Sequence, residues 1–366
     1  MSKTSKSKRL LTLAIALVMA GSLCSCAKTG EPTITIEESK ADLTDHFVEN
    51  TVSSDDTQSE TEDTPSGYGF FYEGDVKNGD IEFFNDKDFN EYNGGTITFH
   101  FNRESFKYPG DLEEGYLVFL DGIPQKVSYD GEEGRFVIIS QPGNTKKEIT
   151  LNITPKITEE MKDKEIFTLR MVSVTGLSKQ KEDAVFSEQR MSSPFSDIKI
   201  KPTVPLEIIE DNDVLSIMPA ELEEILITPQ NSINYNIQDY MDAVLMLNTA
   251  GGSWQSMFVL PEGESSVKAD CIMYGYGSYT GKYRIFFFQN NEPVKIAGGW
   301  DCVDMEIKEG YMTKCEVEFE NVNNRDEIFA IATPLDESVR SSFTMSENRL
   351  VLSEKDPYYI EYKKTA

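Results

Sequence analysis

Histidine is scarce in this sequence, which has only His46 and His100 among its 366 residues. This scarcity excludes three-His zinc sites, two-His-one-carboxylate iron sites and His-based catalytic triads within one chain. Basic residues are also few, because 35 Lys and Arg stand against 63 Asp and Glu, giving a formal net charge of −28. Nucleic-acid binding needs a positive surface that displaces counterions, so we expect no nucleic-acid partner.

The apolar run at the N-terminus is too short to cross a membrane. It extends from Leu10 to about Ala20, whereas a spanning helix needs about 20 apolar residues. Basic residues precede this run, and a short apolar core after a basic start is typical of an export signal. These residues are Lys3, Lys6, Lys8 and Arg9.

The end of this segment resembles a bacterial lipobox. Leu23 stands three places before Cys26, and the small residue Ser25 directly precedes it. The resemblance covers the signal alone, 1–25. It implies removal of that signal and acylation of Cys26, which anchors the protein to the membrane on its extracytoplasmic face. Several acyl chains hold a protein stably, since each buried CH2 contributes about 0.8 kcal/mol. The alternative is an ordinary cleaved signal that happens to contain cysteines.

Residues 26–66 have the composition of a disordered tether. Between positions 31 and 66 there are 11 acidic residues, one basic residue (Lys40) and one aromatic residue (Phe47). Such a segment cannot bury enough apolar area to offset its chain entropy, and its charges repel one another. His46 falls in this tether, so only His100 remains for chemistry in a folded domain.

Short strand patterns separated by turn residues predict a first β-sandwich over residues 67–200. Residues 96–101 alternate with period two, and His100 has the opposite phase to the apolar set, which predicts an outward side chain. The continuous apolar run 116–120 indicates a strand buried on both faces. Asp121 and Gly122 after it are a strong hairpin signal. Further predicted strands lie at 135–139, 148–153 and 166–174.

The segment 192–205, with three prolines, predicts the last strand of this domain and a stiff connector to a second domain, 205–366. Residues 219–225 favour a short helix, with Pro219 in its first turn. The apolar spacing of 237–245 favours an amphipathic helix, although a strand stays possible. Strand patterns return after Gly252. The sequence thus predicts a mainly β protein with two tandem immunoglobulin-like sandwiches, the second carrying one or two short helices.

A weak internal similarity suggests that the two sandwiches are related, although chance could also produce it. Residues 116–119 match 283–286, and residues 165–167 match 327–329. Gly143 and Lys147 match Gly310 and Lys314, and prolines follow the first strand of each set. These prolines are Pro124 and Pro293. The pattern resembles bacterial immunoglobulin-like modules, which often occur in tandem.

No catalytic or metal-binding constellation stands out, so we expect no cofactor, no metal and no enzymatic activity. The segment 86–90 begins like a calcium loop but lacks the glycine at loop position six and the glutamate at position twelve. Cysteines of the folded part are Cys271, Cys302 and Cys315. We expect buried, inert thiols. A hairpin about Gly310 would keep Cys302 away from Cys315, while a bridge from Cys271 to either stays open.

The feature most suggestive of recognition is a group of aromatic residues in the second domain. Tyrosines interleaved with Gly and Ser give rigid contact area and adaptable hydrogen bonding. The predicted ligand-binding residues are Trp254, Tyr274, Tyr276, Tyr279 and Trp300. The alternative is that these residues fill the sandwich core, as we expect for Tyr283 and 286–288.

Three classes of function follow from these features. The first is a surface-exposed lipoprotein that binds a partner without catalysis. Because the chain is so acidic, a neutral glycan or a basic protein surface is the expected ligand. The second is an envelope scaffold or spacer without a ligand. The third is a carboxylate-dependent glycan hydrolase, for which no pair of acids is nominated by its spacing.

Overall fold

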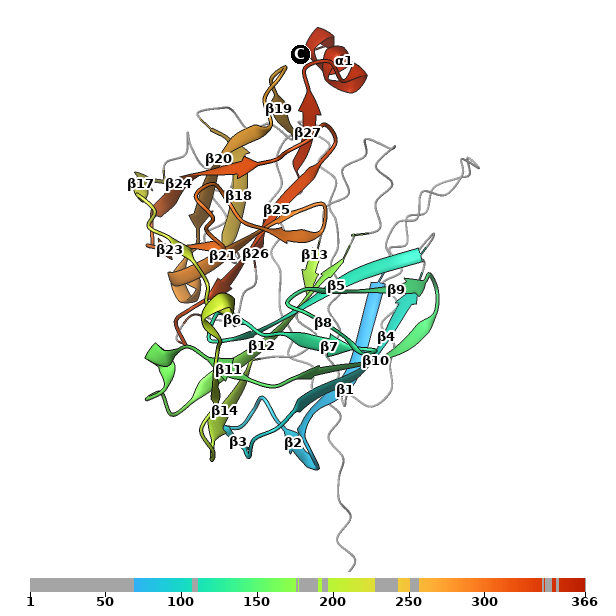
Figure 1. The fold of residues 1–366 in the computed structure, drawn as a ribbon, viewed down its shortest axis with the longest axis vertical. Helices are drawn as coiled ribbons and strands as arrows, with labels where there is room; N and C mark the ends of the chain where they lie inside the picture. Colours follow the sequence, from blue (N-terminus) through green and yellow to red (C-terminus); the bar gives the residue numbers. More distant parts are fainter. Residues whose placement is uncertain are drawn as a thin grey trace, which may run out of the picture.

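We describe a computed structural model of the chain, which is mainly β. The described residues are 69–106, 111–175, 177, 190–192, 197–227, 243–250, 257–337, 339, 344–346 and 349–365. They form two β-sandwiches, which we call the first and the second module. Figure 1 shows them one above the other, the first in blue to green and the second in orange to red. The predicted fold class is confirmed.

The first module has an outer sheet with the strand order β2-β1-β4-β10-β7-β8 and an inner sheet with the order β3-β14-β12-β5-β6. The outer strands are β1 (Gly69–Asn78), β2 (Ile81–Phe83), β4 (Ile97–Phe106), β7 (Val127–Tyr129), β8 (Glu132–Gly134) and β10 (Lys146–Ile153). The inner strands are β3 (Asn90–Tyr92), β5 (Asp111–Leu120), β6 (Ile123–Pro124), β12 (Phe167–Thr175) and β14 (Ile198–Pro202), with β9 (Val137–Pro142) on β5 and β13 (Arg190–Ser192) on β12.

Alternation along β4 builds the first core as predicted. Ile97, Phe99 and Phe101 are buried against Tyr116 and other residues of the inner sheet. His100 has the opposite phase and lies on the outer surface, with its Nε2 atom 2.8 Å from Glu148 Oε1. The prediction of an outward His100 is therefore confirmed, and the residue is paired within a polar sheet face.

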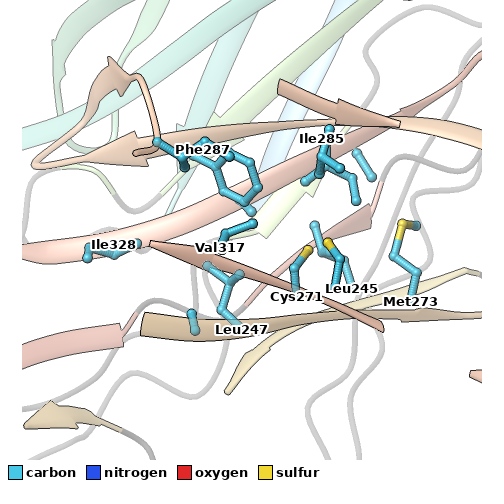
Figure 2. Close-up of a cluster of buried hydrophobic side chains, with 14 of the residues drawn as sticks. Leu245, Leu247, Cys271, Met273, Ile285, Phe287, Val317 and Ile328 are labelled. Carbon is cyan, nitrogen blue, oxygen red and sulfur yellow. The ribbon is translucent and has the colours of Figure 1, made fainter. Parts of the chain in front are cut away.

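The second module has an inner sheet with the order β16-β23-β21-β25-β27-β19 and an outer sheet with the order β17-β24-β20-β18. The inner strands are β16 (Ile217–Met218), β19 (Met257–Leu260), β21 (Gly281–Gln289), β23 (Cys302–Ile307), β25 (Glu327–Pro334) and β27 (Arg349–Ser353), with β22 (Glu292–Val294) on β21 and β26 (Thr344–Met345) on β25. The outer strands are β17 (Glu223–Leu226), β18 (Val244–Thr249), β20 (Ser266–Tyr274) and β24 (Tyr311–Glu320). Figure 2 shows part of the core between these sheets.

The helices of the second module differ from the prediction. Residues 223–226 form strand β17, which pairs with β24, so the helix predicted at 219–225 is wrong. Val244 and Leu245 begin strand β18, so the strand alternative holds there, and 228–242 lie outside the described residues. The one α-helix among the described residues is α1 (Pro357–Thr365). Tertiary pairing with β24 and β20 overrides the local helical preference in both segments.

Helix α1 begins at a capped terminus. Asp356 precedes it, and its Oδ1 atom accepts a hydrogen bond from the N–H of Tyr358 (2.9 Å). Pro357 stands at the first helical position, where a missing N–H costs nothing. Tyr358 and Tyr359 pack against Met257, Leu350 and Leu352, so the helix covers one end of the inner sheet.

Both modules have the immunoglobulin arrangement of strands A, B, E against C, F, G. In the first module these strands are β1, β4 and β10 against β5, β12 and β14, and in the second they are β18, β20 and β24 against β21, β25 and β27. In each module the G strand also pairs in parallel with a short strand, β3 or β19. The six core strands of the two modules therefore share one topology, whereas the strands at the sheet edges differ.

The strand register shows which of the sequence matches relate equivalent positions. Residues 116–119 and 283–286 occupy equivalent strands and have the same phase, because Tyr116 and Tyr283 both face their own core. The match of 165–167 to 327–329 is one residue out of register. Leu169 pairs with Leu120 as Ala330 pairs with Phe287, so Phe167 corresponds to Ile328. A slip of one residue moves every side chain to the opposite face.

The turns follow their sequence signals. Asp121 and Gly122 both have positive φ (49° and 77°) and close the two-residue hairpin between β5 and β6, as predicted. Asn290 and Asn291 do the same between β21 and β22 (φ 53° and 66°). The hairpin predicted about Gly310 is wrong, because β23 and β24 belong to opposite sheets of the second module.

The two inner sheets pack on each other, giving four β layers. Strands β5, β12, β21 and β25 are buried on both faces, and the apolar residues that leave their own cores form a shared cluster. Phe119 and Phe286 meet there with ring centroids 5.5 Å apart. These two residues occupy equivalent positions in the two modules, so the modules pack face to face about an approximate twofold axis, as an isologous dimer would.

The segment between the modules is bonded along much of its length. β15 (Glu207–Ile208) pairs in parallel with β11 (Lys156–Ile157) of the first module. A 3-10 turn (Asp211–Asp213) follows, and β16 then joins the sheet of the second module. Two further 3-10 turns occur, at Glu159–Met161 and Gly277–Tyr279.

Candidate functional site

The structure distributes the predicted aromatic residues over separate places. Tyr274 is 4% exposed, within an apolar cluster on the outer face of the second module, so it packs as the core alternative expected, and its contact with a ligand stays a prediction. Its phase on β20 is opposite to that of the core residues, and it packs beside Ile227 and Met312. Trp254 lies outside the described residues.

Tyr276 and Tyr279 flank the 3-10 turn between β20 and β21 and are half-buried. The Tyr279 carbonyl accepts a hydrogen bond from the hydroxyl of Tyr283 (2.8 Å), which is itself fully buried, as predicted for Tyr283. Tyr276 packs on the outer-face cluster, whereas Tyr279 packs on the core. Ligand contact at these two tyrosines stays a prediction.

Trp300 lies near the opposite end of β21. Tyr279 precedes Gly281, which pairs with Ile307, whereas Trp300 precedes Cys302, which pairs with Phe286. These two register pairs are five residues apart, or about 17 Å. Trp300 and Tyr279 therefore cannot form one stacking platform, although Trp300, half-buried against the core, stays a predicted contact.

The charged and thiol groups singled out in the sequence lie at separate places in the fold. No group of three or more His, Cys, Asp and Glu among them is placed to hold a metal ion. The segment predicted as a solvated acidic turn, 86–90, is closed by Asn90, whose side chain bonds both the N–H and the carbonyl of Phe84 (2.9 and 2.7 Å). Cys271, Cys302 and Cys315 are buried free thiols, as expected.

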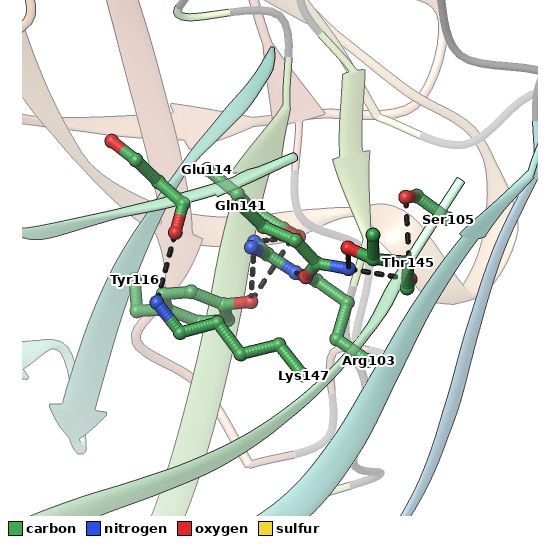
Figure 3. Close-up of polar contacts among 8 residues, drawn as sticks. Arg103, Ser105, Glu114, Tyr116, Gln141, Thr145 and Lys147 are labelled. Carbon is green, nitrogen blue, oxygen red and sulfur yellow. Dashed lines mark hydrogen bonds and ion pairs between the residues drawn. The ribbon is translucent and has the colours of Figure 1, made fainter. Parts of the chain in front are cut away.

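A buried polar network fills one end of the first module (Figure 3). Arg103 and Glu114 are both 0% exposed and form an ion pair of 2.6 Å. The Tyr116 hydroxyl donates to Glu114 (3.0 Å), and Arg103 Nε donates to Gln141 Oε1 (2.7 Å). Because no member faces solvent, a substrate has no access to these groups, and the network is structural.

One pocket lined by described residues lies between the modules. A partly open cavity of about 160 Å3 is bounded by Leu117 and Pro124 of the first module, Leu215 of the connector, and Phe286, Phe288 and Pro293 of the second. Its walls are mainly apolar.

Charged side chains surround this cavity and fasten the connector beside it. Arg135, Lys295 and Asp301 contribute to the lining. Asp213 of the connector pairs with Lys126 (2.6 Å) and Arg135 (3.6 Å) of the first module, and the hydrogen bond from Lys126 lowers the pKa of Asp213. On the other side, Asp301 accepts the N–H of Ser216 (2.8 Å). Leu215 is therefore held between two anchored neighbours.

Sequence reasoning missed this cavity, although one signal for it was present. The run 116–120 predicted a strand buried on both faces, and 286–288 is a similar run. What covers the second face of each strand could not be read from either run. The answer is the other module, and the cavity lies where the two faces do not fit completely.

The comparisons with known proteins give a likeness of fold only. No family model and no curated protein matches the chain. Among solved structures, the chain is similar to the N-terminal Ig1-2 module of the Drosophila receptor protein tyrosine phosphatase DLAR, at 11% identity and a TM-score of 0.19. The match covers 72% of this chain and 93% of that chain. At this TM-score the likeness carries no argument, so the fold assignment rests on strand pairing.

Proposed function

We propose that this protein is a lipid-anchored bacterial binding protein on the extracytoplasmic face of the membrane, and that it acts without catalysis. The observation that carries the binding role is the apolar cavity between two stacked modules. The anchoring role rests on the lipobox-like residues Leu23, Ser25 and Cys26, which lie outside the described residues. None of the helices among the described residues is long and apolar enough to cross a membrane.

The cavity supports a ligand that inserts one apolar group. Its walls come from Leu117, Leu215, Phe286 and Phe288, and its volume of about 160 Å3 suits a single aromatic or branched aliphatic side chain. Protein interfaces often concentrate their binding energy in such a central anchor, surrounded by polar contacts. A protein partner is therefore favoured over a glycan, since the tyrosines and Trp300 do not form a shared stacking surface.

The net charge of the chain also indicates the chemistry of the partner's surface. The chain carries −28 overall, so electrostatic attraction favours a partner with a basic surface around its apolar anchor. Asp213 and Asp301 lie beside the cavity and would face such basic groups, although each already has a basic neighbour within the chain. We expect binding to weaken as salt is raised, because exposed charges are screened.

The binding role is tested with amino-acid derivatives that imitate the anchor. The probes are N-acetyl-tryptophanamide and N-acetyl-leucinamide, with N-acetyl-alaninamide as the small control, measured by ligand-observed NMR on the mature Cys26→Ala chain. We expect saturable binding of the first two with Kd on the order of 1 mM, about −4 kcal/mol. Leu215→Trp should fill the cavity and weaken binding at least tenfold.

The matched control is Leu226→Trp, at an exposed leucine of strand β17 that does not line the cavity. Equal binding by the Leu215 and Leu226 variants would overturn the assignment to this cavity.

The second candidate function is a spacer without a ligand, which the four-layer stack favours because it holds the two modules at a fixed angle. A spacer predicts no saturable binding of any of these probes.

Anchoring is tested separately in cells. Cys26→Ala should release the protein to the medium or stall its processing, because Cys26 occupies the acylated position of the lipobox-like segment. Cys24→Ala is the matched control and should leave the protein in the detergent phase after phase separation. A Cys26→Ala protein that still partitions into detergent, with a Cys24→Ala protein that does not, would show that the assignment of the lipidated residue is wrong.

A further inference from the structure

Two of the three buried cysteines stand directly opposite each other in one sheet. Cys271 of β20 and Cys315 of β24 are register partners in an antiparallel pair. Residues opposite each other in such a pair have Cα atoms about 4.5–5.5 Å apart. This separation falls within the range of about 4.4–6.8 Å that a disulfide needs. The backbone can therefore join these two side chains without moving.

The side chains also point to the same place. Both cysteines face the core of the second module, and their Sγ atoms lie 3.9 Å and 3.8 Å from one atom, the Sδ of Met305 on the facing sheet. Two thiols that touch the same atom from neighbouring strands are close to each other. Figure 2 shows Cys271 in this core, beside Leu245 and between Leu247 and Met273.

The third cysteine, Cys302, cannot join this pair, because its side chain lies on the other face of the inner sheet. Cys302 lies in strand β23 and belongs to the apolar cluster between the modules, on the opposite side of the inner sheet from Met305. Burial raises the pKa of its thiol to about 12. Cys302 is thus an isolated, protonated thiol, and it serves as an internal reference for the other two.

We propose that Cys271 and Cys315 are joined by a cross-strand disulfide in the mature protein, formed by exchange with an exogenous protein or small-molecule disulfide before the second module has closed. The export signal would deliver the chain to a compartment in which disulfides persist. This proposal does not depend on the cavity or its ligand. It assigns a covalent link within one sheet, between strands B and E.

The disulfide forms by thiol–disulfide exchange in two steps. The thiolate of one cysteine attacks the exogenous disulfide, forms a mixed disulfide and expels one thiolate. The second cysteine then attacks the mixed disulfide, closes the Cys271–Cys315 bond and expels the other thiolate. Two cysteine thiols are oxidised and one exogenous disulfide is reduced to two thiols, which take up the two protons. In the closed module these thiols are buried, and the hydrogen bond to Cys315 together with burial raises the pKa of Cys271. The reaction therefore belongs to folding.

The test uses the lipidated protein extracted from its own membrane without reductant. After alkylation under denaturing conditions, peptide mapping by mass spectrometry should find the Cys271 and Cys315 peptides linked and short of two hydrogens, with Cys302 fully alkylated. Full alkylation of both Cys271 and Cys315 would overturn the proposal. A link from Cys302 to either would overturn it equally.

A second measurement separates a disulfide from simple packing. Reductant should lower the melting temperature of the wild-type protein by on the order of 5–10 °C, because the bond closes a loop of over forty residues. The Cys302→Ser variant is the matched control and should show the same drop. The double variant Cys271→Val/Cys315→Val should show none. An equal response of the double variant to reductant would contradict the proposed bond.

Discussion

The two modules pair their strands in the same way but fill their interiors differently. In the first module, the space between the sheets holds a charged network, with Arg103 and Glu114 fully buried. In the second, the corresponding layer holds soft, neutral groups, among them Cys271, Cys315 and Met305. One strand arrangement therefore accepts both an ion-paired and a neutral filling.

The interface between the modules also places different residues at equivalent positions, and there the difference leaves a cavity. Phe119 and Phe286 are equivalent residues and meet near the approximate twofold axis. Away from the axis the symmetry fails, because the position equivalent to Leu117 is Arg284, which pairs with Asp304 (2.7 Å). A leucine on one side and an arginine on the other cannot fill space equally, and the cavity lies on the leucine side.

The largest expected effect tests the difference between the charged interior of the first module and the neutral interior of the second. Arg103→Met leaves the Glu114 carboxylate buried without its partner, and we expect a loss of about 3–5 kcal/mol in the free energy of unfolding. Met305→Leu, a volume-conserving change at a neutral position in the second module, should cost less than about 1.5 kcal/mol. Urea unfolding followed by fluorescence measures both.

The double variant Arg103→Met/Glu114→Leu sharpens this comparison. Replacing both charges with apolar side chains of similar volume should restore most of the lost stability, since no unpaired charge then remains. If the double variant is as unstable as Arg103→Met alone, then hydrogen bonds to Tyr116 and Gln141 matter more than the ion pair. The two interiors would then differ in connectivity and not only in charge.

A smaller effect concerns the face shared by the modules. Phe119→Ala and Phe286→Ala should each cost about 3 kcal/mol, because each opens a space in the same apolar cluster. The two losses of stability should not add, since the rings contact each other.

Proteolysis adds a second measurement of the same interface. A cut in the connector after β14, at 203–206, should leave two wild-type fragments that stay together on size exclusion, whereas the double variant should release them. Separation of the wild-type fragments would contradict the rigid stack.

The smallest effect concerns α1, which has no counterpart among the described residues of the first module. Partial burial would raise the pKa of Asp356, but hydrogen bonds from Asn324 and the Tyr358 N–H, together with Arg325 (3.0 Å), hold the pKa below its usual value. The resulting stability is present above the unfolded pKa of about 3.9 and is lost as pH falls through the folded value. We expect it to be about 1–2 kcal/mol.

Asp356→Asn is the variant that isolates this contribution, because asparagine keeps the cap but does not titrate. The stability difference between wild type and variant, measured by thermal unfolding, should shrink as pH falls below about 4. A difference that stays constant from pH 7 to pH 3 would show that the Asp356 charge does not stabilise the helix.

Much of the fold was determined by the sequence itself. Alternation in 96–101 set the face of every β4 side chain, including His100, and Asp121 with Gly122 set the hairpin, because few residue pairs adopt positive φ twice. The export signal and the tether, which lie outside the described residues, stay predictions from composition. The helix predictions at 219–225 and 237–245 were wrong where the structure describes them, since an edge strand that pairs with a neighbour can override local propensity.

Only the tertiary structure decided what meets across long stretches of sequence. The sequence indicated that 116–120 is buried on both faces, but not that 286–288 covers it. Apolar contacts are non-directional, so an apolar strand face does not specify which segment packs on it. It gave three cysteines without a pairing, and the strand register placed Cys271 opposite Cys315. It also could not place Tyr274 or Trp300, since the phase of each aromatic depends on strand boundaries to a single residue. Local spacing fixes the conformation of a strand, whereas register and layer contacts between distant strands decide which side chains become neighbours.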